Sequence, residues 1–161
     1  MLIPDRFIVS DHDHWRVNHR IDAKLPGYLM LATKHDVDDL SLLPHAALLE
    51  LGPLLARLQA ALRTIFQPVR IYVGRYGHSP GYPIHFHVIP VHGWVERLFW
   101  QDERYRALQQ FAGPARDTPT DGAELTLFIW RELCERPGPP DIEGPTVEDT
   151  IALLRGELAG N

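Results

Sequence analysis

The sequence predicts an α+β fold, in which an antiparallel sheet of about five strands is covered by a long helix and followed by additional C-terminal helices. Three observations support this class. Short apolar runs between turn residues suggest strands, one leucine-rich stretch has helical spacing, and three more helical patterns follow residue 95. No internal repeat is evident, so we treat residues 1–161 as a single domain with a core of about residues 5–95 and a helical extension over about 95–160.

The strands are expected in the first 91 residues. Residues 6–10 and 15–18 alternate around a polar turn, which is typical of a hairpin. Residues 28–32 form a continuous strand-compatible run, which favours a central strand buried on both faces. Residues 69–73 and 84–91 return to the strand pattern on either side of a loop.

The long helix is indicated by apolar residues at three- and four-residue steps, which place them on one face. These residues are Leu48, Leu51, Leu54, Leu55, Leu58, Leu62 and Ile65. Pro53 lies inside the pattern and lacks an amide donor, so we expect either a kink or two abutting helices. Residues 95–111, 121–135 and 146–158 suggest three further helices, with Thr146 as a cap of the last.

Composition limits the classes of partner. A net charge of −5 offers no general attraction to a nucleic acid polymer. No stretch reaches the roughly 18 consecutive apolar residues of a membrane helix, and residues 1–10 do not suggest a signal peptide. Cys134 is the single cysteine, which rules out an internal disulfide and suits a reducing compartment. We therefore expect a cytoplasmic protein without nucleic acid or membrane partners.

Two histidines carry the strongest chemical signal. Because side chains alternate along a strand, His85 and His87 project from the same face of the strand over 84–91. The three residues on the opposite face, Ile84, Phe86 and Val88, are all apolar. One face of this strand is thus expected to join the core, while the other presents two imidazoles.

The loop before this strand, residues 74–83, is rich in glycine and also contains His78 and Ser79. Exposed backbone amides in such a loop suit a phosphate or another anion. Two other interpretations stay open from the residues alone. The histidines could face water or satisfy hydrogen bonds in the core, or they could bind zinc together with His92 or His35.

The segment His85-Phe-His-Val-Ile-Pro90 resembles the end of the histidine triad (HIT-like) signature, in which three histidines alternate with apolar residues. The resemblance extends to other segments in the right order, over roughly residues 5–95. These are Trp15-Arg-Val-Asn18, Pro26-Gly27-Tyr-Leu-Met-Leu, Lys34-His35 and Asp39-Leu-Ser41. Pro83 stands in place of the first histidine of the signature.

The resemblance implies a hydrolase of nucleoside phosphoric anhydrides or phosphoramidates, such as dinucleoside polyphosphates or adenylated amines. In this family the middle histidine attacks the α-phosphorus, and water resolves the covalent nucleotidyl-histidine. His85 matches that nucleophile. His87 matches the last histidine, which contacts a phosphate oxygen and can assist proton transfer to the leaving group.

Further expectations follow from the same resemblance. Asn18 matches a position that binds the ribose hydroxyls, and Ser79 matches one that binds phosphate. His78 is a candidate to stand in for the missing histidine. The resemblance implies a homodimer that needs no metal or other cofactor. Because Pro83 interrupts the triad, a nucleotide-binding protein with little turnover is the alternative function.

Overall fold

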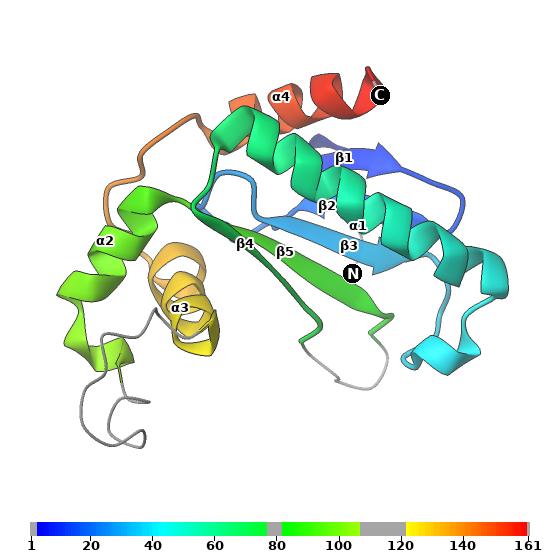
Figure 1. The fold of residues 1–161 in the computed structure, drawn as a ribbon, viewed down its shortest axis with the longest axis horizontal. Coiled ribbons are helices and arrows are strands. Elements are labelled where there is room, and N and C mark those ends of the chain that lie inside the picture. Colours follow the sequence, from blue (N-terminus) through cyan, green and yellow to red (C-terminus); the bar gives the residue numbers. More distant parts are fainter. Residues whose placement is uncertain (1–2, 77–81, 107–121, 161) are drawn as a thin grey trace.

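A five-stranded antiparallel sheet lies at the centre of the protein (Figure 1), as predicted. The structure is a computed structural model that describes residues 3–76, 82–106 and 122–160. The strands are β1 (Ile8–Asp11), β2 (Trp15–His19), β3 (Leu29–Thr33), β4 (Arg70–Gly74) and β5 (His85–Val91). Their spatial order is β1-β2-β3-β5-β4, so β5 lies between β3 and β4, and β3 is the central strand.

The described residues include four α-helices, which pack against the sheet or beside it. They are α1 (His45–Phe66), α2 (Gly93–Gln101), α3 (Gly122–Phe128) and α4 (Val147–Ala159). A π-helical segment, Ile129–Glu135, continues directly from α3, and short 3-10 turns span Asp5–Phe7, Leu40–Leu42 and Glu103–Tyr105. Figure 1 shows α1 crossing one face of the sheet with α4 beside it, while α2 and α3 lie together at the left of the view. The fold class is therefore α+β, as expected.

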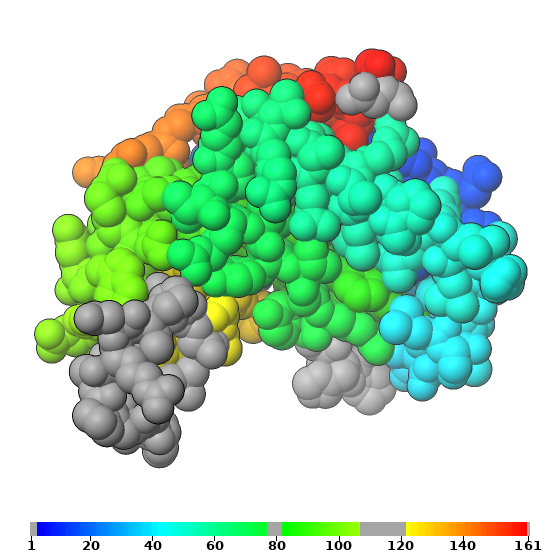
Figure 2. Space-filling view, in the orientation of Figure 1, coloured from blue at the N-terminus to red at the C-terminus, as the bar shows by residue number. Residues whose placement is uncertain are grey.

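The alternation of side chains divides the core between the two faces of the sheet. On one face, Trp15, Leu31 and Val88 pack beneath α1 and α4. Side chains of α1 cover the centre of this face in Figure 2. On the opposite face, Ile89 and Val91 pack with residues of α2, α3 and the π-helical segment. His85 and His87 alternate with the residues that α1 covers, so they belong to this second face.

The structure excludes one of the two expectations for Pro53. The helix α1 runs unbroken from His45 to Phe66, so the prediction of two abutting helices is wrong. A proline at this position leaves the carbonyl group of Leu49 without its usual helical donor. Leu49 is 63% exposed, so water can reach this turn of the helix.

The C-terminal helices differ from their predicted limits. The helix expected over 95–111 ends at Gln101, where Asp102 accepts a hydrogen bond from the amide of Arg104 and begins a 3-10 turn. Residues 107–111 lie outside the described part of the chain. The cap of α4 is confirmed, because Thr146 Oγ1 accepts a hydrogen bond from the Asp149 amide at 3.1 Å. Among the described residues, no helix is long and apolar enough to cross a membrane.

Candidate active site

The strand β5 places His85 and His87 side by side on the face away from α1. Their ring centroids are 5.3 Å apart, and the ring planes are inclined by 60°. His85 is half-buried, whereas His87 is only 6% exposed. Two imidazoles are thus adjacent but differ in their access to solvent, which gives them different chemistry.

His85 is oriented by the backbone of the residue two positions before it. Its Nδ1 lies 3.1 Å from the carbonyl oxygen of Pro83. A carbonyl group can only accept a hydrogen bond, so Nδ1 must carry the proton and the neutral ring has a bare Nε2. An imidazole held in this tautomer can act as a nucleophile through Nε2. Any residue at position 83 would supply this carbonyl, so proline preserves the contact.

His87 is held by Tyr28, the residue just before β3. Tyr28 Oη lies 2.9 Å from His87 Nδ1. The same hydroxyl oxygen accepts a hydrogen bond from Arg20 Nη1 at 3.0 Å and another from Trp130 Nε1. Arg20 is in turn held by Asp22, with nitrogen–oxygen distances of 2.6 and 3.0 Å. Residues of the N-terminal half and of the C-terminal extension therefore meet at one histidine.

Two aromatic rings from different segments pack around His87. The ring of Tyr76 lies 5.3 Å from that of His87, and the ring of Trp130 lies 5.5 Å from it. Tyr76 lies directly over Gly74, where a Cβ atom would be 2.5 Å from the tyrosine ring. Glycine at position 74 thus permits Tyr76 to approach the histidine.

This enclosure determines the charge of His87. Burial lowers the pKa of His87 to about 3, and the neighbouring His85 and Arg20 act in the same direction, while Asp22 opposes them. Burial also raises the pKa of Tyr28, so its hydroxyl keeps the proton. At neutral pH, His87 is therefore a neutral imidazole that can donate or accept a hydrogen bond but does not carry an acidic proton.

Asn18 lies on the same face as the histidines. In the register of the sheet, Asn18 is paired with Met30, and Met30 is paired with His87. Two strand spacings of about 4.8 Å separate the backbones at positions 18 and 87 by roughly 10 Å. Asn18 is 3% exposed, and its Nδ2 donates to the carbonyl oxygen of His19 at 2.8 Å. His78 and Ser79 lie outside the described residues.

Among the described residues, neither His92 nor His35 joins the histidine pair as a third zinc ligand. His92 Nε2 lies 2.9 Å from the Pro26 carbonyl oxygen, and His35 pairs with His14 at 3.0 Å. Within residues 3–76, 82–106 and 122–160, no three histidine, cysteine, aspartate or glutamate side chains lie close enough together to hold a metal ion.

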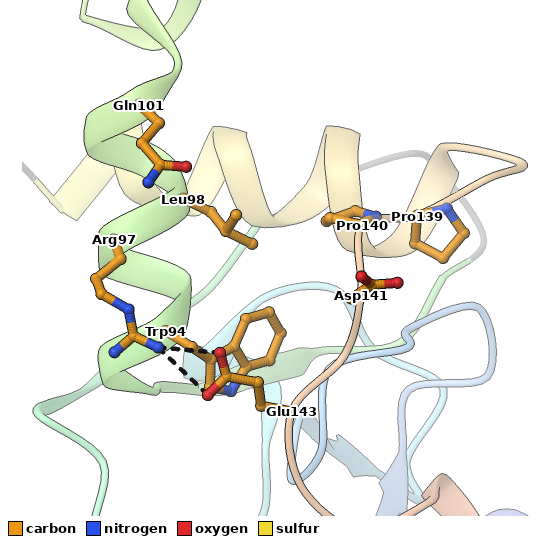
Figure 3. Close-up of a pocket in the computed structure, with 8 residues that line it drawn as sticks. All are labelled: Trp94, Arg97, Leu98, Gln101, Pro139, Pro140, Asp141 and Glu143. Atoms are coloured by element: carbon orange, nitrogen blue, oxygen red, sulfur yellow. Dashed lines mark hydrogen bonds and ion pairs between the residues drawn. The ribbon is translucent and has the colours of Figure 1, made fainter.

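Two cavities in the described part of the chain lie away from the histidine pair. A cavity of about 470 Å³ lies between α2 and the segment over residues 139–143 (Figure 3). Arg97 and Glu143 form an ion pair at its wall, with nitrogen–oxygen distances of 2.9 and 3.3 Å. A second cavity of about 420 Å³ shares these two residues. Neither cavity is lined by His85 or His87, so chemistry rather than cavity size marks the candidate site.

Sequence reasoning missed the residues that surround His87. Tyr28 was assigned only to the central strand, although its polar tip in an apolar run was a usable signal. Nothing in the sequence connects Trp130 with His87, because the contact depends on how the C-terminal segment packs on the sheet.

Comparison with known proteins identifies the family of the chain. The model of the HIT domain matches residues 3–93, which is more than half of the chain. The chain therefore belongs to the HIT family, the histidine triad proteins. No curated protein matches the chain by sequence.

Several solved structures share the fold. A HIT-like protein involved in cell-cycle regulation from Bartonella henselae has a TM-score of 0.54 and 18% identity, over 96% of this chain and 88% of that chain. A zinc-bound histidine triad family protein from Mycobacterium smegmatis has a TM-score of 0.54 and 15% identity, over 96% of this chain and 84% of that chain. A uridylyltransferase has a TM-score of 0.60 and 15% identity, over 98% of this chain and 42% of that chain. At these identities, the likeness shows the fold alone.

Proposed function

We propose that this protein is a nucleotidyl hydrolase that acts on nucleoside phosphoric anhydrides or phosphoramidates through a covalent intermediate on His85. The observation that carries the proposal is the hydrogen bond from His85 Nδ1 to the Pro83 carbonyl oxygen, which leaves Nε2 bare. Dinucleoside polyphosphates and adenylated amines both offer an α-phosphorus to such a nucleophile. Membership of the HIT family and the order of the matching segments support this class of substrate.

In the first step, His85 Nε2 forms a bond to the α-phosphorus, and the bond from phosphorus to the leaving oxygen or nitrogen breaks. The leaving group departs with the electron pair of that bond and takes up a proton from the solvent. In the second step, water attacks the phosphorus and gives up a proton to the solvent, the nitrogen–phosphorus bond breaks and His85 is regenerated as the nucleoside monophosphate leaves. Neutral His87 would contact a phosphate oxygen in both steps.

Three further residues would contact the substrate. Asn18 would bind the ribose hydroxyls at roughly two strand spacings from the phosphate. Ser79 and His78 would bind the phosphate. We further propose that the protein works in the cytoplasm as a homodimer without a metal or other cofactor. Its oligomeric state can be measured by light scattering.

A second function, nucleotide binding without turnover, is favoured by one specific observation. His87 has no acidic proton near neutral pH, since its pKa is lowered to about 3, and Pro83 has no side-chain donor. A leaving group of high basicity would then have to take its proton from water. Such a protein would bind a nucleotide at the same place but release it unchanged.

Single-turnover kinetics separate the two functions. The protein, in excess, is mixed with adenosine 5′-phosphoramidate or with diadenosine tetraphosphate in the presence of a chelator, and AMP release is followed. The hydrolase proposal expects release that survives chelation and is lost in His85→Ala. His45→Ala is the matched control, because His45 is an exposed histidine at the start of α1. Binding without release would favour the second function, and failure to bind either nucleotide would overturn both.

A further inference from the structure

We propose that Trp130 and Arg20 are positioning residues, which act through Tyr28 to hold His87 in the tautomer with its proton on Nε2. The inference rests on the proposed function for its catalytic consequence, but the tautomer itself can be measured without substrate. It assigns a role to the C-terminal extension, whose π-helical segment carries Trp130.

The assignment follows from counting hydrogens at the Tyr28 hydroxyl group. This group has one hydrogen to donate and two lone pairs that can accept. Arg20 Nη1, at 3.0 Å, and Trp130 Nε1 are both obligate donors, and together they occupy both lone pairs. The tyrosine hydrogen is then left for the third neighbour of the oxygen, which is His87 Nδ1 at 2.9 Å.

If Nδ1 accepts a hydrogen bond, it cannot carry a proton. A neutral imidazole with a bare Nδ1 must carry its proton on Nε2. The doubly protonated form is excluded near neutral pH, because burial lowers the pKa of His87. The tyrosinate form is excluded as well, because burial raises the pKa of Tyr28.

The two adjacent histidines are therefore held in opposite tautomers. His85 carries its proton on Nδ1 and has a bare Nε2, since its Nδ1 faces the Pro83 carbonyl oxygen. His87 has the reverse arrangement and offers an Nε2–H donor. The pair thus combines a nucleophilic nitrogen with a hydrogen-bond donor suited to a phosphate oxygen. Without fixed tautomers, the same two rings could present two donors or two bare nitrogens.

Both donors to Tyr28 are themselves held in place. The π-helical segment is anchored by Ile129 and Leu133, which are fully buried against the sheet. The carbonyl oxygen of Leu133 also accepts a hydrogen bond from the Lys24 amide at 2.8 Å. The guanidinium group of Arg20 lies over the Tyr28 ring at 5.1 Å and over the Trp130 ring at 5.5 Å. Trp130 therefore donates from a fixed position and cannot accept in return.

The test is long-range ¹H–¹⁵N NMR of the full chain labelled with ¹⁵N-histidine, near neutral pH. A bare and a protonated ring nitrogen have well-separated ¹⁵N shifts, so each tautomer is read directly. In the wild type, we expect His87 as the Nε2–H form and His85 as the Nδ1–H form. Assignments come from His85→Ala and His87→Asn spectra.

Two variants remove one hydrogen bond each while keeping an aromatic ring. Tyr28→Phe deletes the donor to His87, and Trp130→Phe frees one lone pair of the tyrosine. In both, the His87 signals should shift towards a mixture of tautomers, whereas the His85 signals should stay unchanged. Trp100→Phe is the matched control, because Trp100 is 39% exposed on α2 and its ring lies against Phe99 and Arg106.

The outcomes distinguish this inference from the proposed function. A wild-type His87 protonated on Nδ1, or a tautomer unchanged in both variants, would overturn the inference even if the protein hydrolyses nucleotides. Opposite tautomers in a protein that never releases AMP would leave the inference standing and refute the hydrolase proposal. In an active enzyme, equal populations of the two His87 tautomers would lower kcat about twofold, because half of the molecules lack the donor.

Discussion

Acidification should destabilise this protein through His87 more than through an ordinary histidine. In the unfolded chain, the pKa of a histidine is about 6.5. In the folded protein, burial lowers the pKa of His87 to about 3. Above the unfolded value, neither state binds the proton, so the folded state keeps its full stability. Below it, only the unfolded state binds the proton, and stability is lost as the pH falls.

The size of this effect follows from the two pKa values. Between about pH 7.5 and about pH 5, the unfolded state gains about 2 kcal/mol from protonating this one histidine, because one pH unit below the pKa is worth about 1.4 kcal/mol. His19 and His92 also have a pKa lowered by burial, so they add losses of the same sign. A variant that lacks only His87 is therefore needed to isolate its contribution.

The assay is urea unfolding of the wild type and of His87→Asn at both pH values. The free energy of unfolding of the wild type should fall by about 2 kcal/mol more than that of the variant. The comparison cancels the contributions of His19 and His92, which are present in both proteins. An equal loss in the two proteins would refute the account of His87 as a buried neutral imidazole.

Three further predictions concern the surroundings of the site and the C-terminal extension. Gly74→Ala should displace the Tyr76 ring, because the new Cβ would lie 2.5 Å from it. The nuclear Overhauser effects between the Tyr76 and His87 rings should then be lost. Gly156→Ala, which meets nothing within 4 Å, is its control. Thr146→Ala removes the cap of α4 and should lower the free energy of unfolding by about 1 kcal/mol, measured with urea. Cys134 is buried, and burial raises its pKa to about 12, so it should react with a thiol reagent only after denaturation.

The sheet and the orientation of the histidine pair could be predicted because they depend on local patterns. The two-residue period of residues 84–91 was enough to place His85 and His87 on one face, and their register with β3 agrees with it. The leucine spacing predicted α1 for the same reason. The alternative of two helices at Pro53 was wrong, because the cost of a missing hydrogen bond depends on whether water can replace it.

The network around His87 could not be predicted, because it joins segments that are distant in the sequence. Tyr28, Arg20 and Trp130 meet only when the π-helical segment packs against the second face of the sheet. No period or spacing encodes that contact. The low pKa of His87 follows from the same packing, so its neutral state could not be predicted from the sequence either.

The nucleophilic role of His85 is tested most directly by trapping the covalent intermediate. The protein is mixed with adenosine 5′-phosphoramidate labelled at the phosphorus, quenched in alkali during the first turnover and digested for peptide mapping. A phosphorus–nitrogen bond to histidine survives alkali and is cleaved by acid, which identifies the linkage. We predict label on His85, in the peptide that contains residues 84–91, and none in His85→Ala. AMP release without labelled protein, or label on His87, would contradict the assignment of His85 as the nucleophile.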